Sequence, residues 1–443
     1  MKLREYQEQS ADFLYERDRA IVLASVGAGK TAIALTAMKE MLKDGHVRRW
    51  LVLAPKRVAM SVWPTEAEIW APDLSVSVAV GSPKKRADAF FANVDVVVTN
   101  YDNIQSISSE SMKAFDGVVF DELTRLKNPS GKRFKTLYEK IASIPIRWGL
   151  TGSFTSNGLE DVFGQCKIVD ETLLGKTKSK FLQQYFVLIN RDYGLWVPQA
   201  NAFDGVMGRV KPMTFLLENK EYKDQLPPLH VVEVKVPLTD REPYDKMKRE
   251  FVTELNGEKI TAVSAAAMTS KLQQLASGFA YQTTTFAGAK KMESSKKPVW
   301  YSSHKFDRFD EIIEENQRTP TLVFYQFVEE LEELKRRHPH LQTLDDPNAI
   351  ERFNAGQIEI LAAHPKSASH GLNLQKCAHH VIFLSLPWSF ELFEQAVGRL
   401  HRGGQKHDVW CYVMMTEKTI DERIWASLHD KKALAEIAIE ELK

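Results

Sequence analysis

Residues 20–35 read AIVLASVGAGKTAIAL. A short apolar run, a turn with two glycines and an amphipathic segment follow one another, which is the strand, loop and helix setting of a phosphate-binding loop. Gly27 and Gly29 let the backbone curl so that its N–H groups point at phosphate oxygens, and the start of the helix adds partial positive charge. We therefore expect Lys30 to reach the β and γ phosphates of ATP, and the Thr31 hydroxyl to bind Mg²⁺.

The loop departs from the strict pattern at one position, because Ala24 stands where the first glycine is usual. A glycine-rich turn with a surface lysine is the alternative interpretation of the same residues. The strand and helix patterns on either side favour the phosphate loop.

A second apolar run ends in two carboxylates, in the segment Val118-Val119-Phe120-Asp121-Glu122. Ligands of open α/β sheets bind at the carboxyl ends of the strands. We expect Asp121 to hold Mg²⁺, directly or through water, and Glu122 to orient or deprotonate the attacking water. On its own, an Asp-Glu pair would more readily be a solvated strand end, but the phosphate loop in the same lobe favours catalysis.

Short apolar runs alternate with helix-length amphipathic stretches near both ends of the chain, which predicts βαβ units and parallel sheets. We predict an α/β fold of two RecA-like lobes with parallel sheets, plus helical insertions between and on the lobes. The predicted domains are an ATP-binding lobe at 1–165, helical insertions and a linker at 166–300, and a second lobe without a phosphate loop at 301–443. The strands expected in the first lobe are Ala20–Ala24, Trp50–Ala54, Asp95–Thr99, Val118–Asp121 and Arg147–Thr151.

Two arginines stand out in the second lobe. Residues 395–402 read QAVGRLHR, and on the helix predicted there Arg399 and Arg402 would share one face. An arginine supplied across a cleft stabilises the charge of a phosphoryl group in transfer. The alternative is a pair of ordinary surface arginines in ion pairs. The nearby segment Gly371–Gln375 suits a lining of the same cleft, or a plain turn.

Composition excludes several classes of protein. The 443 residues carry 59 Lys+Arg and 58 Asp+Glu, so a nucleic-acid partner would have to be met by positive charge gathered locally. The three separated cysteines show neither metal-ligand spacing nor a disulfide framework, which favours a reducing compartment. We see no secretory signal and no apolar run of membrane-spanning length, so we expect no membrane partner.

The motifs together have an order typical of one family. The chain resembles the Swi/Snf-type ATPases of helicase superfamily two, and in wording it is most similar to short phage or prophage members. Any one motif is weak, but the whole set in this order is specific. The segments that carry the resemblance are Leu3–Gln7, Ala24–Thr31, Leu53–Lys56 followed by Trp63, Val98–Tyr101, Asp121–Asn128, Gly149–Ser153, Leu322–Tyr325, Ser369–Gln375, and Gln395–Arg402 with Gly404-Gln405.

The resemblance implies roles for further residues. Arg4 and Gln7 would lie on the adenine side of ATP, Gly371 and Gln395 would help to bind the nucleotide, and the segment 301–443 would be a helicase lobe. Duplex DNA would be held mainly through its backbone, which makes binding non-specific and salt-sensitive. The residues expected to contact nucleic acid are Lys56, Thr99, Asn100, Lys127, Asn128 and Ser367.

The function expected on this basis is a DNA-stimulated ATPase that moves along duplex DNA and remodels DNA or protein–DNA complexes, in the cytoplasm of a bacterium or a phage-infected host cell. One alternative is a strand-separating DNA or RNA helicase, which needs a wedge element. Another is a nucleotide-dependent DNA-binding scaffold with little turnover. Two departures from the family leave that second alternative open, since Thr124 replaces the histidine of the DEAH box and Phe154 replaces a usual proline.

Overall fold

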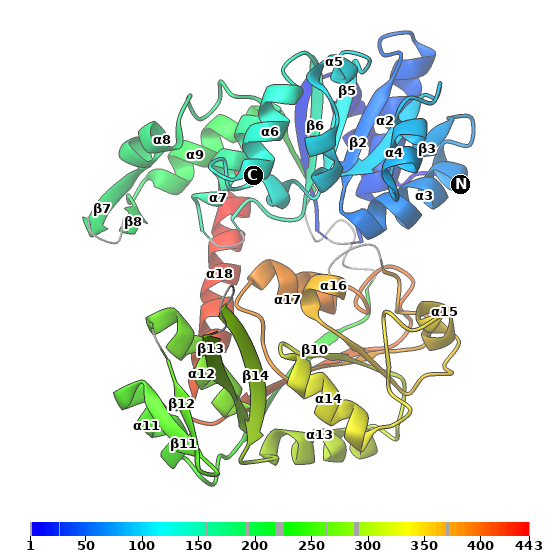
Figure 1. Ribbon diagram of the computed structural model, residues 1–443. Coiled ribbons are helices and arrows are strands. Elements are labelled where there is room, and N and C mark those ends of the chain that lie inside the picture. The colour runs from blue at the N-terminus through cyan, green and yellow to red at the C-terminus, as the bar shows by residue number, and fades with distance from the viewer. Residues whose placement is uncertain are drawn as a thin grey trace. The chain divides into compact units, whose positions relative to one another are not determined.

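The computed structural model describes residues 2–25, 27–155, 158–190, 195–217, 226–262, 264–287, 292–368 and 372–442 (Figure 1). The chain divides into two compact units. The first unit consists of Met1–Gln225 with Lys431–Lys443, and the second consists of Leu226–Asp430. The predicted middle segment, 166–300, therefore contributes to both units.

The first unit is built on a parallel sheet of seven strands in the order β3-β4-β2-β5-β6-β1-β9. All five strands expected in this lobe are present. Because every pairing is parallel, the carboxyl ends of the strands lie along one edge of the sheet. The strands are β1 (Arg19–Leu23), β2 (Trp50–Ala54), β3 (Val76–Val78), β4 (Val96–Asn100), β5 (Gly117–Asp121), β6 (Ile146–Thr151) and β9 (Thr214–Leu216).

Alternating side chains of these strands enter two separate cores, one on each face of the sheet. In β1, Ile21 belongs to one core and Val22 to the other. Helices cover both faces and fill these cores. One face carries α1 (Glu5–Tyr15), α2 (Lys30–Lys43) and α3 (Trp63–Trp70), and the other carries α4 (Pro83–Phe90), α6 (Lys132–Lys140), α7 (Asp161–Val169), α8 (Lys178–Tyr185) and α9 (Ala202–Val210).

The second unit has its own parallel sheet, with six strands in the order β10-β19-β18-β15-β17-β16. Together the two sheets and their helices confirm the predicted α/β fold of two RecA-like lobes. The strands are β10 (Leu229–Val236), β15 (Thr321–Phe324), β16 (Gln342–Thr343), β17 (Ile360–Ala363), β18 (His380–Phe383) and β19 (Val409–Thr416). The helices are α11 (Glu242–Glu250), α12 (Ala265–Ala276), α13 (His304–Glu315), α14 (Val328–Arg337), α15 (Ala349–Asn354), α16 (Pro365–Ala368), α17 (Phe390–Val397) and α18 (Ile420–Leu442), which continues into the first unit.

The insertions contain antiparallel hairpins as well as helices. The insertions were expected to be helical, but α11 ends at Glu250 and the chain continues into the hairpin of β11 (Val252–Leu255) and β12 (Glu258–Thr261). The turn is Asn256-Gly257, with φ of 48° and 81°. Asn-Gly with positive φ at both residues is the favoured two-residue hairpin turn, so this sequence signal was available. Two further hairpins pair β7 (Phe186–Asn190) with β8 (Leu195–Pro198) and β13 (Phe279–Ala287) with β14 (Met292–Trp300).

None of the helices in the described part of the chain combines the length and the apolar character needed to span a membrane.

A buried polar cluster joins α12, α13 and the end of β19 in the second unit. The Nε2 of His304 lies 3.1 Å from the carbonyl oxygen of Ala276, and its Nδ1 lies 2.8 Å from the Ser302 hydroxyl. A carbonyl only accepts, so Nε2 carries the proton, and a neutral ring satisfies both contacts. Burial, with the neighbouring Lys305 ammonium, lowers the pKa of His304 to about 4.

This histidine predicts acid sensitivity of the fold. The folded-state pKa lies below the unfolded value of about 6.5, so the unfolded chain takes up the proton first and stability falls as the pH drops from neutrality toward 4. Between pH 7 and pH 5 we expect His304 to account for a loss of about 2 kcal/mol in the free energy of unfolding, measured by urea denaturation. The variant His304→Gln should show a shallower dependence, and His340→Gln, at an exposed histidine, should match the wild type. Equal acid dependence in all three proteins would contradict this assignment.

Candidate ATP site and nucleic-acid interface

The loop between β1 and α2 has the backbone shape that the sequence required. Gly27 and Gly29 adopt φ of 90° and 82°, in the left-handed region that favours glycine. A Cβ at Gly29 would lie 2.2 Å from the Nε2 of Gln7, so a side chain there would also displace a neighbour. The ammonium of Lys30 donates to the carbonyl oxygens of Ala24 at 2.6 Å and of Ser25 at 3.1 Å, which places its charge over the loop.

A hydrogen bond joins the first turn of α1 to the phosphate loop. Gln7 is buried, and its Nε2 donates to the carbonyl oxygen of Ala28 at 3.2 Å. Its Oε1 accepts the backbone N–H of Arg4 at 3.0 Å, and the Arg4 side chain is exposed. The structure thus places Gln7 against the phosphate loop, with the backbone of Arg4 bound to it.

Asp121 ends β5 and is buried at the carboxyl edge of the sheet. Its Oδ2 accepts the indole N–H of Trp63 at 2.8 Å, and its backbone carbonyl accepts the Tyr101 hydroxyl at 2.8 Å. Burial raises the pKa of Asp121, while the Trp63 hydrogen bond and the charge of Lys30 act in the opposite direction. The influence of Lys30 on this carboxyl shows that the two predicted ATP-site residues share one neighbourhood.

Glu122 directly follows, in a turn that holds its side chain away from the sheet core. Its backbone is left-handed, with φ of 62° and ψ of 64°. Its side chain is half-buried, and Oε1 accepts the hydroxyl of Thr124 at 3.0 Å. Non-glycine residues rarely adopt this conformation, and where they do, it tends to serve a functional site.

The oxygen atoms at this edge suit Mg²⁺. Thr31, in the first turn of α2, offers a hydroxyl, and Asp121 offers a carboxylate. Within the described residues, no group of three or more His, Cys, Asp or Glu side chains could hold a metal by itself. A site of one carboxylate and one hydroxyl, completed by phosphate oxygens and water, is the arrangement that Mg²⁺ favours in nucleotide enzymes.

The residues of the first unit that are expected to contact nucleic acid lie at the end of β4 or follow β2 and β5, so they lie at the same edge. Lys56 and Asn128 are exposed, and the Asn128 Oδ1 accepts the backbone N–H of Ser130. Lys127 lies 3.2 Å from a carboxylate oxygen of Asp161. Asn100 is buried at the end of β4.

Thr99 differs from the other candidates at this edge. It is fully buried, and its hydroxyl donates to the carbonyl oxygen of Ala79 at 2.7 Å. Its contact with nucleic acid stays a prediction, and what the geometry shows is support for the end of β4.

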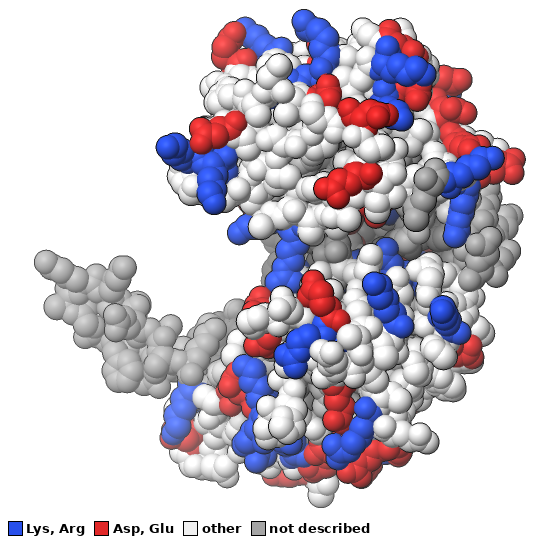
Figure 2. Space-filling model, turned by 90° about the vertical axis from the view of Figure 1, so that its right-hand side faces the viewer, with Lys and Arg blue, Asp and Glu red and all other residues white. Residues whose placement is uncertain are grey.

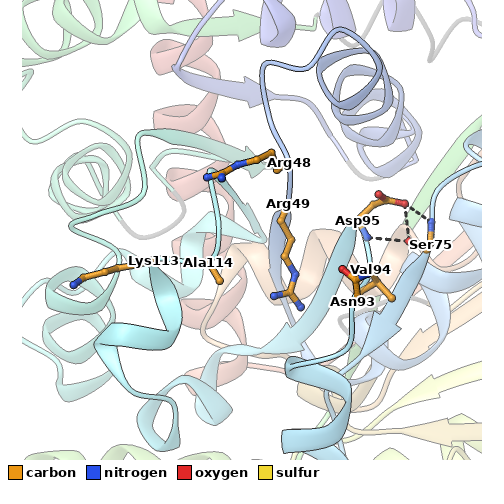
Figure 3. A pocket seen from close by; sticks show the side chains of 8 residues that line it. All are labelled: Arg48, Arg49, Ser75, Asn93, Val94, Asp95, Lys113 and Ala114. Carbon is orange, nitrogen blue, oxygen red and sulfur yellow. Dashed lines mark hydrogen bonds between the residues drawn. The ribbon is translucent and has the colours of Figure 1, made fainter.

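One cavity of the first unit lies away from this site. A hollow of about 530 Å³ opens at the amino ends of β2, β4 and β5, where Arg49 lies across from Ser75 and Asp95 (Figure 3). The guanidinium of Arg49 is occupied by the carbonyl oxygens of Phe90 and Ala92. The site motifs after β1, β2, β4 and β5 lie at the carboxyl ends of these strands, whereas the cavity lies at their amino ends. The cavity is therefore at the opposite edge of the sheet.

In the second unit, the two arginines are held differently from the expectation. The predicted helix was to carry both, but α17 ends at Val397 with Gly398 as its cap, and a series of turns follows. The shared helical face is therefore wrong. Tertiary contacts gather the arginines instead, since Arg399 and Arg402 each donate through Nη1 to the carbonyl oxygen of Leu372, at 3.2 and 3.1 Å.

Two remaining candidates of this unit lie in α16 and α17. Gln395 is buried in α17, and its Nε2 donates to Glu391 at 3.3 Å. Ser367 is exposed in α16, and its hydroxyl donates to the carbonyl oxygen of His364 at 2.8 Å. Gly371 lies outside the described residues.

Comparison with known proteins identifies the family. Residues 6–277 match the SNF2-related domain, and residues 304–404 match the helicase conserved C-terminal domain. The chain belongs to the SNF2-related family. It is thus a helicase-like, ATP-dependent protein, as the motif order predicted.

Two relatives and one solved structure are similar to this chain. Putative protein p41 of Acyrthosiphon pisum secondary endosymbiont phage 1 is 32% identical over 99% of this chain and 98% of its own length. The uncharacterized ATP-dependent helicase YqhH of Bacillus subtilis (strain 168) is 22% identical over 96% of this chain and 77% of its own. The Sulfolobus solfataricus SWI2/SNF2 ATPase core in complex with dsDNA shares 20% identity, with a TM-score of 0.47, over 99% of this chain and 93% of that one.

Trp63 is the residue of this SNF2-related site that sequence reasoning missed. It was noted only as following the Leu53–Lys56 motif, and 58 residues separate it from Asp121. Its side chain is almost fully buried at the start of α3. A tryptophan in a helix after β2 is ordinarily a core residue, so no local pattern marked its indole N–H as a partner of the carboxylate.

The role of Trp63 leads to a testable prediction. The variant Trp63→Phe keeps an aromatic ring in the core but removes the N–H that holds Asp121. Because a hydrogen bond to a charged group contributes roughly 1.5–3 kcal/mol, we expect kcat for ATP hydrolysis to fall by about tenfold or more, with the fold retained. Trp70→Phe is the matched control, since its indole donates to Glu66 away from the site. Equal rates for the two variants would rule out the role of Trp63.

Proposed function

We propose that this protein is a DNA-stimulated ATPase that moves along duplex DNA and remodels DNA or protein–DNA complexes. One observation carries the proposal. The groups suited to ATP lie at the ends of β1 and β5. The polar groups suited to a phosphate backbone lie at the ends of β2, β4 and β5. Both sets therefore lie along one edge of one parallel sheet. β5 belongs to both sets, because Asp121 and Glu122 are followed within one turn by Lys127 and Asn128.

The chemistry of hydrolysis follows from the side chains of the first unit. Lys30 and the N–H groups of the loop bind the β and γ phosphates. Glu122 takes a proton from the attacking water. Mg²⁺, which Thr31 and Asp121 would hold, supplies positive charge at the phosphate oxygens.

The second unit contributes the arginines. Arg399 and Arg402 lie within the region that matches the helicase C-terminal domain, and both guanidinium groups converge on one carbonyl oxygen. This arrangement supports a role in stabilising the charge of the phosphoryl group in the transition state. ATP binding and release would then open and close the two units, and that motion would move the protein along its track.

DNA would be held through its backbone by a local set of charges. On the face drawn in Figure 2, basic and acidic side chains are interspersed, in keeping with a net charge of +1. The proposed contacts with DNA are therefore few: Lys56, Lys127 and Asn128, with Ser367 in the second unit. Binding of this kind is non-specific and weakens as salt rises. We place this activity in the cytoplasm of a bacterium or a phage-infected cell.

The decisive measurement is the ATPase rate without nucleic acid and with duplex DNA, single-stranded DNA and RNA in parallel. We expect the greatest stimulation by duplex DNA, decreasing with salt, and no strand separation in a displacement assay. Stimulation confined to single strands or RNA, with displacement, would favour the helicase alternative. Binding without turnover in any arm would favour a scaffold.

Two variants test the chemistry in that assay. Lys30→Ala should abolish turnover, while Lys39→Ala, a lysine on the same helix that pairs with Asp73 on the surface, should retain it. Glu122→Gln should bind ATP but not hydrolyse it. Turnover retained by Lys30→Ala would refute the phosphate-loop assignment, and wild-type rates in Glu122→Gln would exclude its role as the base.

A separate variant tests the second unit. Arg402→Ala should lower kcat by more than it weakens ATP binding, because the arginine acts on charge that develops in the transition state. The exposed Arg336→Ala, in α14, is the control and should leave both quantities unchanged. A loss of affinity with unchanged kcat would contradict the proposed role of Arg402.

A further inference from the structure

Thr124 stands where the family resemblance places the histidine of the DEAH box, and its contact in this structure gives it a different role. Its side chain is 3% exposed, and its hydroxyl donates to the Oε1 of Glu122 at 3.0 Å. We propose that Thr124 is a positioning residue that sets the orientation of the Glu122 carboxylate toward the attacking water. This inference rests on the proposed function, in which Glu122 takes the proton of that water.

The turn after β5 explains why the side chain of Thr124 can reach the carboxylate of Glu122. With Glu122 in the left-handed conformation, the chain reverses into the short 3-10 helix η3 (Leu123–Leu126). The backbone N–H of Arg125 donates to the carbonyl of Glu122 at 3.0 Å, and that of Lys127 donates to the carbonyl of Thr124 at 3.2 Å. These two hydrogen bonds close the turn and bring the Thr124 hydroxyl beside the carboxylate.

The core fixes this turn in place. Leu123 and Leu126 are almost fully buried, on either side of Thr124. A Cβ at Gly149 would lie 2.6 Å from a methyl group of Leu123, and a Cβ at Gly164 would lie 2.5 Å from the carbonyl oxygen of Leu126. Both glycines therefore let their elements approach the turn closely. The Thr124 hydroxyl is consequently a donor held by packing, which is what accurate positioning of a base requires.

The chemistry needs such a donor. A glutamate side chain has three rotatable bonds, and a base acts well only when one lone pair faces the proton that it removes. A hydroxyl that donates to one carboxylate oxygen restricts the plane of the group without adding charge. A short β-branched side chain meets this need inside the tight turn, since its χ1 is already restricted.

The test uses three substitutions at this position in the full chain. Thr124→Ser keeps the hydroxyl, Thr124→Val keeps the shape without it, and Thr124→Ala removes both. We expect Thr124→Val and Thr124→Ala to lower kcat by about tenfold or more with ATP affinity nearly unchanged, and Thr124→Ser to stay close to the wild type. Thr36→Val, which removes a hydroxyl that donates within α2, is the matched control and should leave kcat unchanged.

A double-variant cycle separates positioning from a general structural effect. If Thr124 acts through Glu122, then Thr124→Val should cause little further loss in a Glu122→Asp background, which keeps a carboxylate and so a measurable rate but moves it away from the Thr124 hydroxyl. Thermal unfolding of each protein checks that the fold is retained.

Several outcomes would overturn the inference. Equal losses in Thr124→Ser and Thr124→Val, wild-type kcat in Thr124→Val, a pure change in ATP affinity, or additive losses in the double variant would each do so. Wild-type protein that shows no nucleic-acid-stimulated turnover would instead refute the proposed function, and the inference with it.

Discussion

Burial of one carboxylate at the end of β5 is the constraint on which the first unit depends. A buried charge is costly unless it is paired or accepts hydrogen bonds. Asp121 meets this condition through the indole of Trp63, which comes from α3, and through the charge of Lys30, which begins α2. Residues from α2 and α3, which are distant in the sequence from β5, thereby interact with the carboxylate of Asp121. The parallel sheet makes this possible, because β1, β2 and β5 end at the same edge.

The same edge of the sheet offers a way to couple ATP hydrolysis to contact with the phosphate backbone of DNA. The turn that follows Asp121 holds Glu122 and Thr124, packs two leucines into the core, and then presents Lys127 and Asn128. A rigid turn of this kind joins the side chains suited to water activation to those suited to a phosphate backbone. In the second unit, the carbonyl oxygen of Leu372 accepts hydrogen bonds from two arginines that follow the end of α17.

Much of the fold was predictable from local pattern. The apolar runs at β1, β2, β4, β5 and β6 are short, bounded and buried on both faces, which is the clearest strand signal in an α/β protein. The insertions were harder to predict, because hairpins such as β11–β12 have strands of only four residues with mixed polarity. The Asn256-Gly257 turn carried a usable signal, whereas the strand at 292–300 did not, since its lysines and serines are typical of a loop.

The sequence by itself determined the two-lobed α/β class and predicted the phosphate loop and the carboxylate pair, because these rest on residues adjacent in the chain whose spacing dictates local geometry. Only the tertiary structure decided which partners hold them. The indole that meets Asp121, the glutamine wedged against Gly29, the carbonyl shared by Arg399 and Arg402, and the buried hydroxyl of Thr99 all depend on contacts across the fold. Sequence periodicity reports which face of an element is buried, and it holds no information on which distant atom that face will meet.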